Sequence, residues 1–116
     1  MGINNKDQIQ IDLLEIVKDI DEEIRNLSSR DPIFGFISTK FIKCGKKNCK
    51  CNFNTKNLHG PYYYLRIEPK YKYTNYLGKK IPQIIKERIE IGSSIKNLEK
   101  KRIKILETLS SLQTFT

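Results

Sequence analysis

Two segments of this chain, one near each end, carry apolar residues at helical spacing, and this pattern constrains the fold more than any other feature. From Lys6 to Leu27 the sequence contains neither glycine nor proline. Its apolar residues fall at alternating intervals of four and three, at Leu13, Val17, Ile20, Ile24 and Leu27. This spacing aligns them along one side of an α-helix, which we predict over residues 5–29.

The second helical segment begins at Ile81-Pro82, because proline fits the first turn of a helix. Apolar residues then recur every seven positions, at Ile84, Ile91, Leu98, Ile105 and Leu112. We predict one helix over residues 82–113, continuous through Gly92. The two apolar stripes are expected to pack on each other, within one chain or between two, and the greater length of the second favours a homodimer.

Between these helices the pattern changes to that of β-strands. Aromatic and β-branched residues fill 34–43, 62–67 and 71–77, and such residues favour strands. The short connection Glu68-Pro69-Lys70 suits a hairpin. We therefore predict an α+β fold: a small three-stranded antiparallel sheet flanked by an N-terminal helix (1–31) and a long, coiled-coil-like C-terminal helix (81–116), with a basic β module at 32–80 between them.

All three cysteines and the only histidine lie close together in this module, at Cys44, Cys49, Cys51 and His59. Three thiolates and one imidazole are a ligand set found in structural zinc sites, in which no position stays open for water. The spacing C-x4-C-x-C-x7-H matches neither the zinc ribbon nor the zinc knuckle. The sequence predicts one Zn²⁺ that staples the loop. The alternatives are three free thiols in a reducing compartment with a solvent-facing His59, or a redox or catalytic thiol.

Charge is concentrated in the same module. Residues 40–80 contain eleven Lys or Arg and one acid, Glu68, whereas residues 1–31 carry a net charge of −4. Such a surface favours a polyanionic partner, because phosphates attract cations regardless of sequence. We predict that DNA or RNA is bound by the residues of this set: Lys43, Lys46, Lys47, Lys50, Arg66, Lys70, Lys72 and Tyr73, with the tyrosine able to stack on unpaired bases.

A set of motifs resembles a known family. It comprises Cys44-Gly45-Lys46, Cys49-Lys50-Cys51, the run from His59 to Tyr64, then Tyr76 and Ile81-Pro82. Over residues 34–110 these resemble a family of small bacterial and archaeal proteins with a Cys-Gly-Lys, Cys-x-Cys, His-Gly-Pro-Tyr pattern and no established activity. The N-terminal helix is outside that pattern. Because some members occur near mobile genetic elements, the resemblance hints at nucleic acid.

Other functions are less favoured by the sequence. An adaptor that oligomerises or binds a protein through its helices, with purely structural zinc, is the alternative to nucleic-acid binding. We do not expect an enzyme, because the central region has no glycine-rich phosphate cradle and no paired carboxylates. No apolar run reaches the roughly 18 residues of a spanning helix, and the first ten residues lack a secretory pattern, so a cytoplasmic protein is expected.

Overall fold

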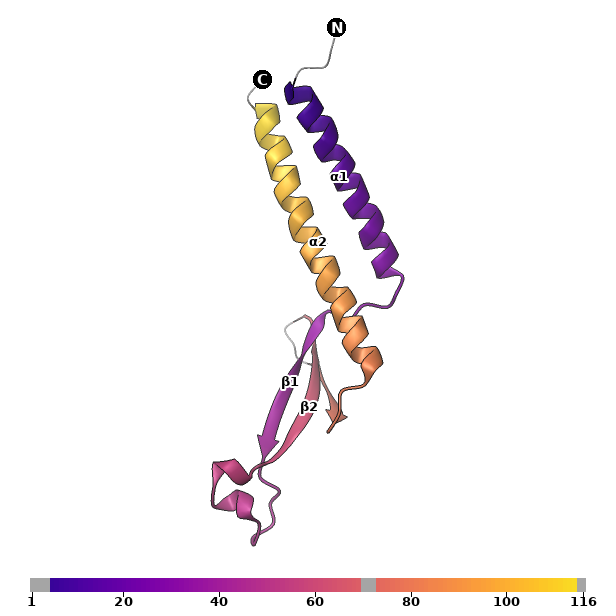
Figure 1. Cartoon of the computed structure of the whole chain (residues 1–116). Helices are drawn as coiled ribbons and strands as arrows, with labels where there is room; N and C mark the ends of the chain where they lie inside the picture. Colours follow the sequence, from indigo (N-terminus) through magenta and orange to yellow (C-terminus); the bar gives the residue numbers. More distant parts are fainter. Residues whose placement is uncertain (1–4, 70–72, 115–116) are drawn as a thin grey trace. The chain divides into compact units, whose positions relative to one another are not determined.

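The computed structural model describes residues 5–69 and 73–114 and confirms the α+β class. Helix α1 (Asn5–Ser28) is followed by strands β1 (Gly35–Ile42), β2 (His59–Ile67) and β3 (Tyr73–Gly78) and by helix α2 (Gln83–Thr114) (Figure 1). Two single-turn 3₁₀ helices, η1 (Lys50–Asn52) and η2 (Thr55–Asn57), lie between β1 and β2. The chain forms two compact units, one of residues 33–89 and one of residues 1–32 with 90–116.

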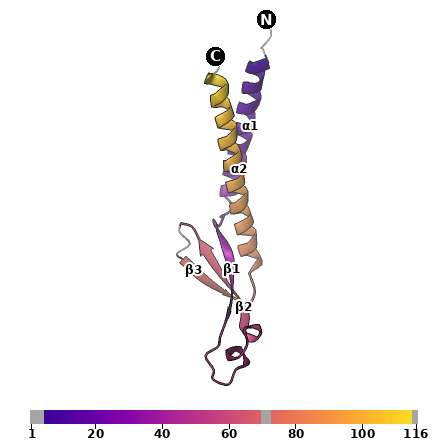
Figure 2. The same cartoon turned by 90° about the vertical axis from the view of Figure 1, so that its left-hand side faces the viewer.

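The three strands form one antiparallel sheet with β2 between β1 and β3 (Figure 2). Ile37 pairs with Leu65, and Leu65 with Asn75. The pairing slips once between β1 and β2, since Lys40 faces Tyr62 while Ile42 faces His59. β2 therefore holds one extra residue there, a bulge that contains Gly60 and Pro61.

One face of the sheet supplies the core of its unit. Leu65 is only 3% exposed, and Ile33, just before β1, is also buried. The backbone N–H of Ile33 donates to the carbonyl of Arg88 in α2 at 3.0 Å. Tyr63 shares the face of Leu65, and it lines a hollow together with Lys86 of α2. The first turns of α2 therefore lie on this face.

The helical unit pairs α1 with the later part of α2 within one chain. Val17, Ile20 and Ile91 of the predicted stripes are buried in its core, and so are Ile95 and Leu109, which lie between the seven-residue positions of the second stripe. Arg102 Nε donates to Asp21 Oδ1 at 2.7 Å across the pair. Arg102 thus lies at the edge of the helix pair, where its charged end remains partly exposed to solvent.

The start of the second strand differs from the prediction. Strand β2 begins at His59 rather than Tyr62, because Gly60 and Pro61 form a bulge instead of a turn. Helix α2 runs through Gly92 without a break, as expected. Of the predicted third strand, residues 71 and 72 lie outside the described part, as does Lys70 in the connection before it.

Candidate metal centre

The four side chains predicted to bind a metal converge in the described structure. The Sγ atoms of Cys44, Cys49 and Cys51 and a ring nitrogen of His59 all lie within 4.8 Å of one another. Cys44 Sγ and Cys51 Sγ are 3.7 Å apart, and Cys49 Sγ is 3.1 Å from His59 Nε2. Residues 44 to 59 therefore close a loop on one point.

Three local elements place the four candidate ligands. Cys44 follows the end of β1, Cys49 caps η1, Cys51 lies within η1, and His59 opens β2. The pairing of Ile42 with His59 holds the two ends of the loop together.

Two glycines allow this path of the backbone. Gly45 has a φ of +83°, a left-handed conformation that suits the turn directly after Cys44. Gly60 has a φ of +143°, and a Cβ placed there would lie 2.8 Å from the carbonyl oxygen of Lys40. The bulge thus needs a glycine next to the histidine.

This donor set could hold a metal ion, and one of its separations matches that of tetrahedral zinc. With Zn–S bonds of about 2.3 Å, the sulfurs of a tetrahedron are about 3.8 Å apart, and the Cys44–Cys51 separation is 3.7 Å. The backbone N–H of Cys44 donates to Cys51 Sγ at 3.5 Å. Such an N–H···S bond supports a thiolate ligand from outside the coordination shell.

The three thiols differ in burial, and hydrogen bonds shift the pKa values of Cys49 and Cys51. Cys51 is buried, Cys49 is half-buried and Cys44 is exposed. The backbone N–H of Cys51, then the Cys51 and Cys44 thiols, lower the pKa of Cys49, with Lys46 adding to the effect. The Cys44 N–H lowers the pKa of Cys51, but burial and the other thiols outweigh it and raise that pKa overall.

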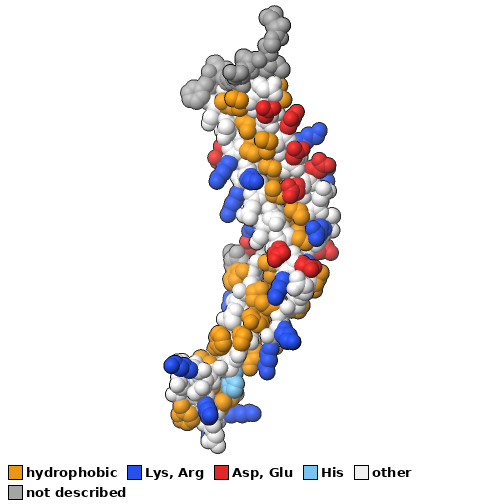
Figure 3. All heavy atoms as spheres, viewed as in Figure 1, with side chains coloured by type: hydrophobic (Ala, Val, Ile, Leu, Met, Phe, Trp, Pro, Cys, Tyr) orange, Lys and Arg blue, Asp and Glu red, His pale blue; other side chains and the backbone are white. Residues whose placement is uncertain are grey.

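The Asn52 side chain holds the loop through its backbone carbonyls, and the lysine side chains stay exposed. Asn52 Nδ2 donates to the carbonyls of Lys46 at 2.6 Å and Lys47 at 3.3 Å. Six lysines of residues 40–56 are exposed: Lys40, Lys43, Lys46, Lys47, Lys50 and Lys56. In Figure 3, blue side chains surround the visible histidine and no red one lies beside it.

Arg66, Lys70, Lys72 and Tyr73 were also predicted to bind nucleic acid. Arg66 lies on β2, where its Nε donates to Ser38 Oγ at 3.2 Å. Lys70 and Lys72 lie outside the described residues. The backbone of Tyr73 pairs with Ile67 at the start of β3, but its side chain is outside the described part.

The sequence reasoning missed Lys40, Tyr64 and Tyr76 as a set. Lys40 Nζ lies 4.8 Å from the ring centroid of Tyr64, whose ring is 5.2 Å from that of Tyr76. The two-residue period of a strand shows which of its own residues share a face. The register between strands was also needed to place Lys40, Tyr64 and Tyr76 on one face.

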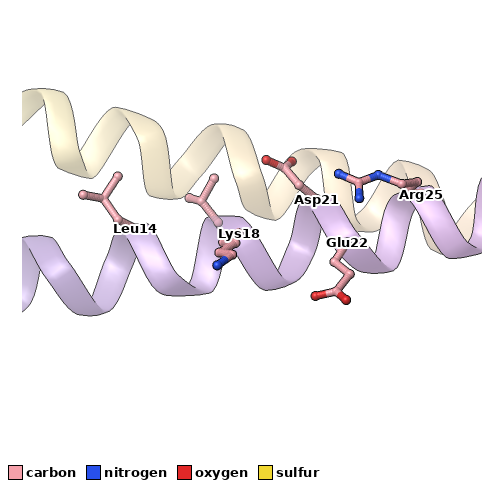
Figure 4. Close-up of a pocket in the computed structure, with 6 residues that line it drawn as sticks. Leu14, Lys18, Asp21, Glu22 and Arg25 are labelled. Carbon is pink, nitrogen blue, oxygen red and sulfur yellow. The ribbon is translucent and has the colours of Figure 1, made fainter.

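A hollow along α1 is a separate feature of the helical unit. It is lined by Leu14, Val17, Lys18, Asp21, Glu22 and Arg25. In Figure 4, Asp21 points toward the neighbouring helix, whereas the ends of Lys18 and Glu22 point away from it. Its side chains include no thiol or imidazole, so it offers none of the ligands of the metal centre.

The chain belongs to the family described as Domain of unknown function (DUF6788), whose profile matches residues 8–87. The match includes most of α1, which the resemblance over residues 34–110 left out. No curated protein and no solved structure matches the chain. In the described residues, neither helix has the length of apolar sequence that a membrane crossing requires.

Proposed function

We propose that this protein binds nucleic acid through a zinc-stapled basic loop, mainly by contact with the phosphate backbone. The observation that carries the proposal is the run of six exposed lysines around the Cys/His cluster, with no acidic residue between positions 32 and 67. Each lysine that meets a phosphate releases condensed counterions, and this gives binding without base recognition.

The metal in this proposal is Zn²⁺, and its role is structural. Three thiolates and one imidazole are ligands that zinc accepts, and together they fill its four positions. A catalytic zinc would need an open position for water, so we do not assign an enzymatic activity. Because the thiols must stay reduced to bind metal, the proposal includes a reducing compartment such as the cytoplasm.

Charge reversal of the loop tests the proposal. Lys46, Lys47 and Lys50 changed together to Glu should abolish binding of DNA and RNA at 50 mM salt. The Asn52 bonds go to backbone carbonyls, so these changes should leave the loop closed.

The matched control reverses Lys100, Lys101 and Lys104, three exposed lysines of α2, and changes the net charge equally. Binding that falls equally in both variants would reflect net charge alone. Binding that survives in the loop variant would reject the proposal.

A second proposed function, self-association through the helical unit, is favoured by its exposed apolar side chains. Leu14 is 56% exposed in the hollow of α1, and Ile9, Ile16 and Ile103 are exposed as well. The hollow also carries both signs of charge, Lys18 and Arg25 beside Asp21 and Glu22, which suits a second copy of the same surface. Solution mass of the wild type and of Leu14→Asp tests this, since a dimer should dissociate in the variant.

A further inference from the structure

One face of the sheet carries a group of three tyrosines together with two cations. Side chains two residues apart on a strand share a face, and the register places Ser38, Tyr64 and Tyr76 in one row across the sheet. The described side chains of this platform face are Phe36, Ser38, Lys40, Tyr62, Tyr64, Arg66 and Tyr76.

Tyr76 is the centre of its aromatic group. Its ring centroid lies 5.2 Å from that of Tyr64 and 6.3 Å from that of Tyr62, at angles near 50°. Tyr76 nevertheless remains 59% exposed. Its neighbours therefore fix the ring without covering it.

Two cations lie on the same face. Lys40 Nζ is 4.8 Å from the centroid of the Tyr64 ring, and the Nε of Arg66 is held by Ser38 Oγ. The face carries no acidic side chain among its described residues. The cations of this face suit a partner with several negative charges, and its tyrosines suit a partner with flat rings.

None of the described aromatic residues of this face is among the buried core residues. Leu65, the most buried of the described sheet residues, points to the opposite side, where Tyr63 and the start of α2 line a common hollow. A cluster of tyrosines on the other face therefore has a different use.

We infer that the platform face stacks the unpaired bases of a single-stranded nucleic acid, with Tyr76 as the main stacking surface and Lys40 and Arg66 as phosphate contacts. This inference rests on the proposed function and narrows it from nucleic acid in general to single strands. A duplex keeps its base faces inside the stack, whereas an unpaired strand presents them to aromatic side chains.

The test measures fluorescence anisotropy with four 15-nucleotide probes: oligo-dT, oligo-U, a mixed-sequence DNA duplex and an abasic DNA strand of equal charge. The wild type should bind oligo-dT and oligo-U well above both the duplex and the abasic strand. Equal affinity for oligo-dT and the abasic strand would overturn the inference, because stacking needs bases. Equal affinity for the duplex would overturn it as well.

Substitutions locate the stacking surface. Tyr76→Leu should weaken oligo-dT binding by roughly 5- to 150-fold and leave binding of the abasic strand unchanged, whereas Tyr76→Phe should retain most of the affinity. Phe53→Leu removes another exposed ring, on the metal loop, and should change little. A loss with Phe53→Leu equal to that of Tyr76→Leu, or no loss with Tyr76→Leu, would overturn the assignment.

Different outcomes would reject the proposed function and the stacking role of the platform face. If no probe binds at 50 mM salt, the proposed function is wrong. If all probes bind equally and only the Lys46, Lys47 and Lys50 reversal removes binding, the proposed function stands and the platform inference is wrong. Unchanged metal content and thermal midpoint of Tyr76→Leu show that the variant remains folded.

Discussion

Cys49 Sγ lies 3.1 Å from His59 Nε2, although nine residues separate them in the chain. That contact ties Cys49 to the start of β2. Cys44, just after β1, approaches Cys51 to 3.7 Å and ties the other end of the loop of residues 44–59. Two pairs of ligands therefore meet from opposite ends of one loop, an arrangement that a single tetrahedral ion would hold in place.

We expect one zinc ion per chain. Elemental analysis of reduced protein should give about one equivalent, and Co²⁺ replacement should give visible absorption bands of a tetrahedral site with thiolate ligands. A zinc content well below one equivalent in a reduced preparation would reject the site.

Loss of a thiolate should unfold the β module. Cys49→Ser should lower the thermal midpoint and remove the bound metal, because metal binding contributes directly to the folding free energy of small metal-stapled modules. The matched control is Asn48→Ser, an exposed position in the same loop, which should leave both unchanged. An unaltered midpoint in Cys49→Ser would contradict a structural metal.

Gly60→Ala should destabilise the module more than Gly45→Ala. Both positions have positive φ, but only at Gly60 would the added Cβ meet backbone, 2.8 Å from the Lys40 carbonyl, while at Gly45 it would meet nothing within 4 Å. Backbone strain of this kind costs about 1–3 kcal/mol. We expect the loss of unfolding free energy to lie near the top of this range for Gly60 and near the bottom for Gly45. Denaturant unfolding measures both, and equal losses would mean that the bulge can shift.

Charge placed in the helical core should be costly. Val17→Asp or Ile95→Asp buries an unpaired carboxylate and should cost several kcal/mol. Asp21→Asn should cost about 1 kcal/mol or less, because its ion pair with Arg102 is about 40% exposed. Thermal unfolding followed by circular dichroism compares the core substitutions with Asp21→Asn. Equal losses of stability would contradict the observed packing.

The salt dependence of binding should report phosphate contacts. If about five lysines of the basic module meet phosphates, the slope of log affinity against log salt is roughly −3.5 for a single strand and −4.5 for a duplex. Each Lys→Ala change, at Lys43 for example, should reduce it by somewhat under one unit. Tyr76→Leu should lower affinity without changing the slope, because stacking releases no counterions.

Much of the architecture followed from local sequence patterns. The spacing of Leu13, Val17 and Ile20 predicted α1, since helical periodicity is set by the sequence itself, and the predicted range 5–29 agrees with Asn5–Ser28 to within one residue. Ile84 shows where periodicity is insufficient: it continues the seven-residue repeat but is 59% exposed. It lies in the first turn of α2, in the unit that contains the sheet rather than the one that contains α1.

The sequence alone identified the helices, the strands, the basic module and the four candidate metal ligands, because residue type and spacing encode these directly. Only the tertiary structure decided that Cys44, Cys49, Cys51 and His59 reach one point and that Lys40, Tyr64 and Tyr76 share one face. Those relations depend on strand register and on the bulge at Gly60-Pro61. A shift of one residue in either would turn each side chain to the opposite face.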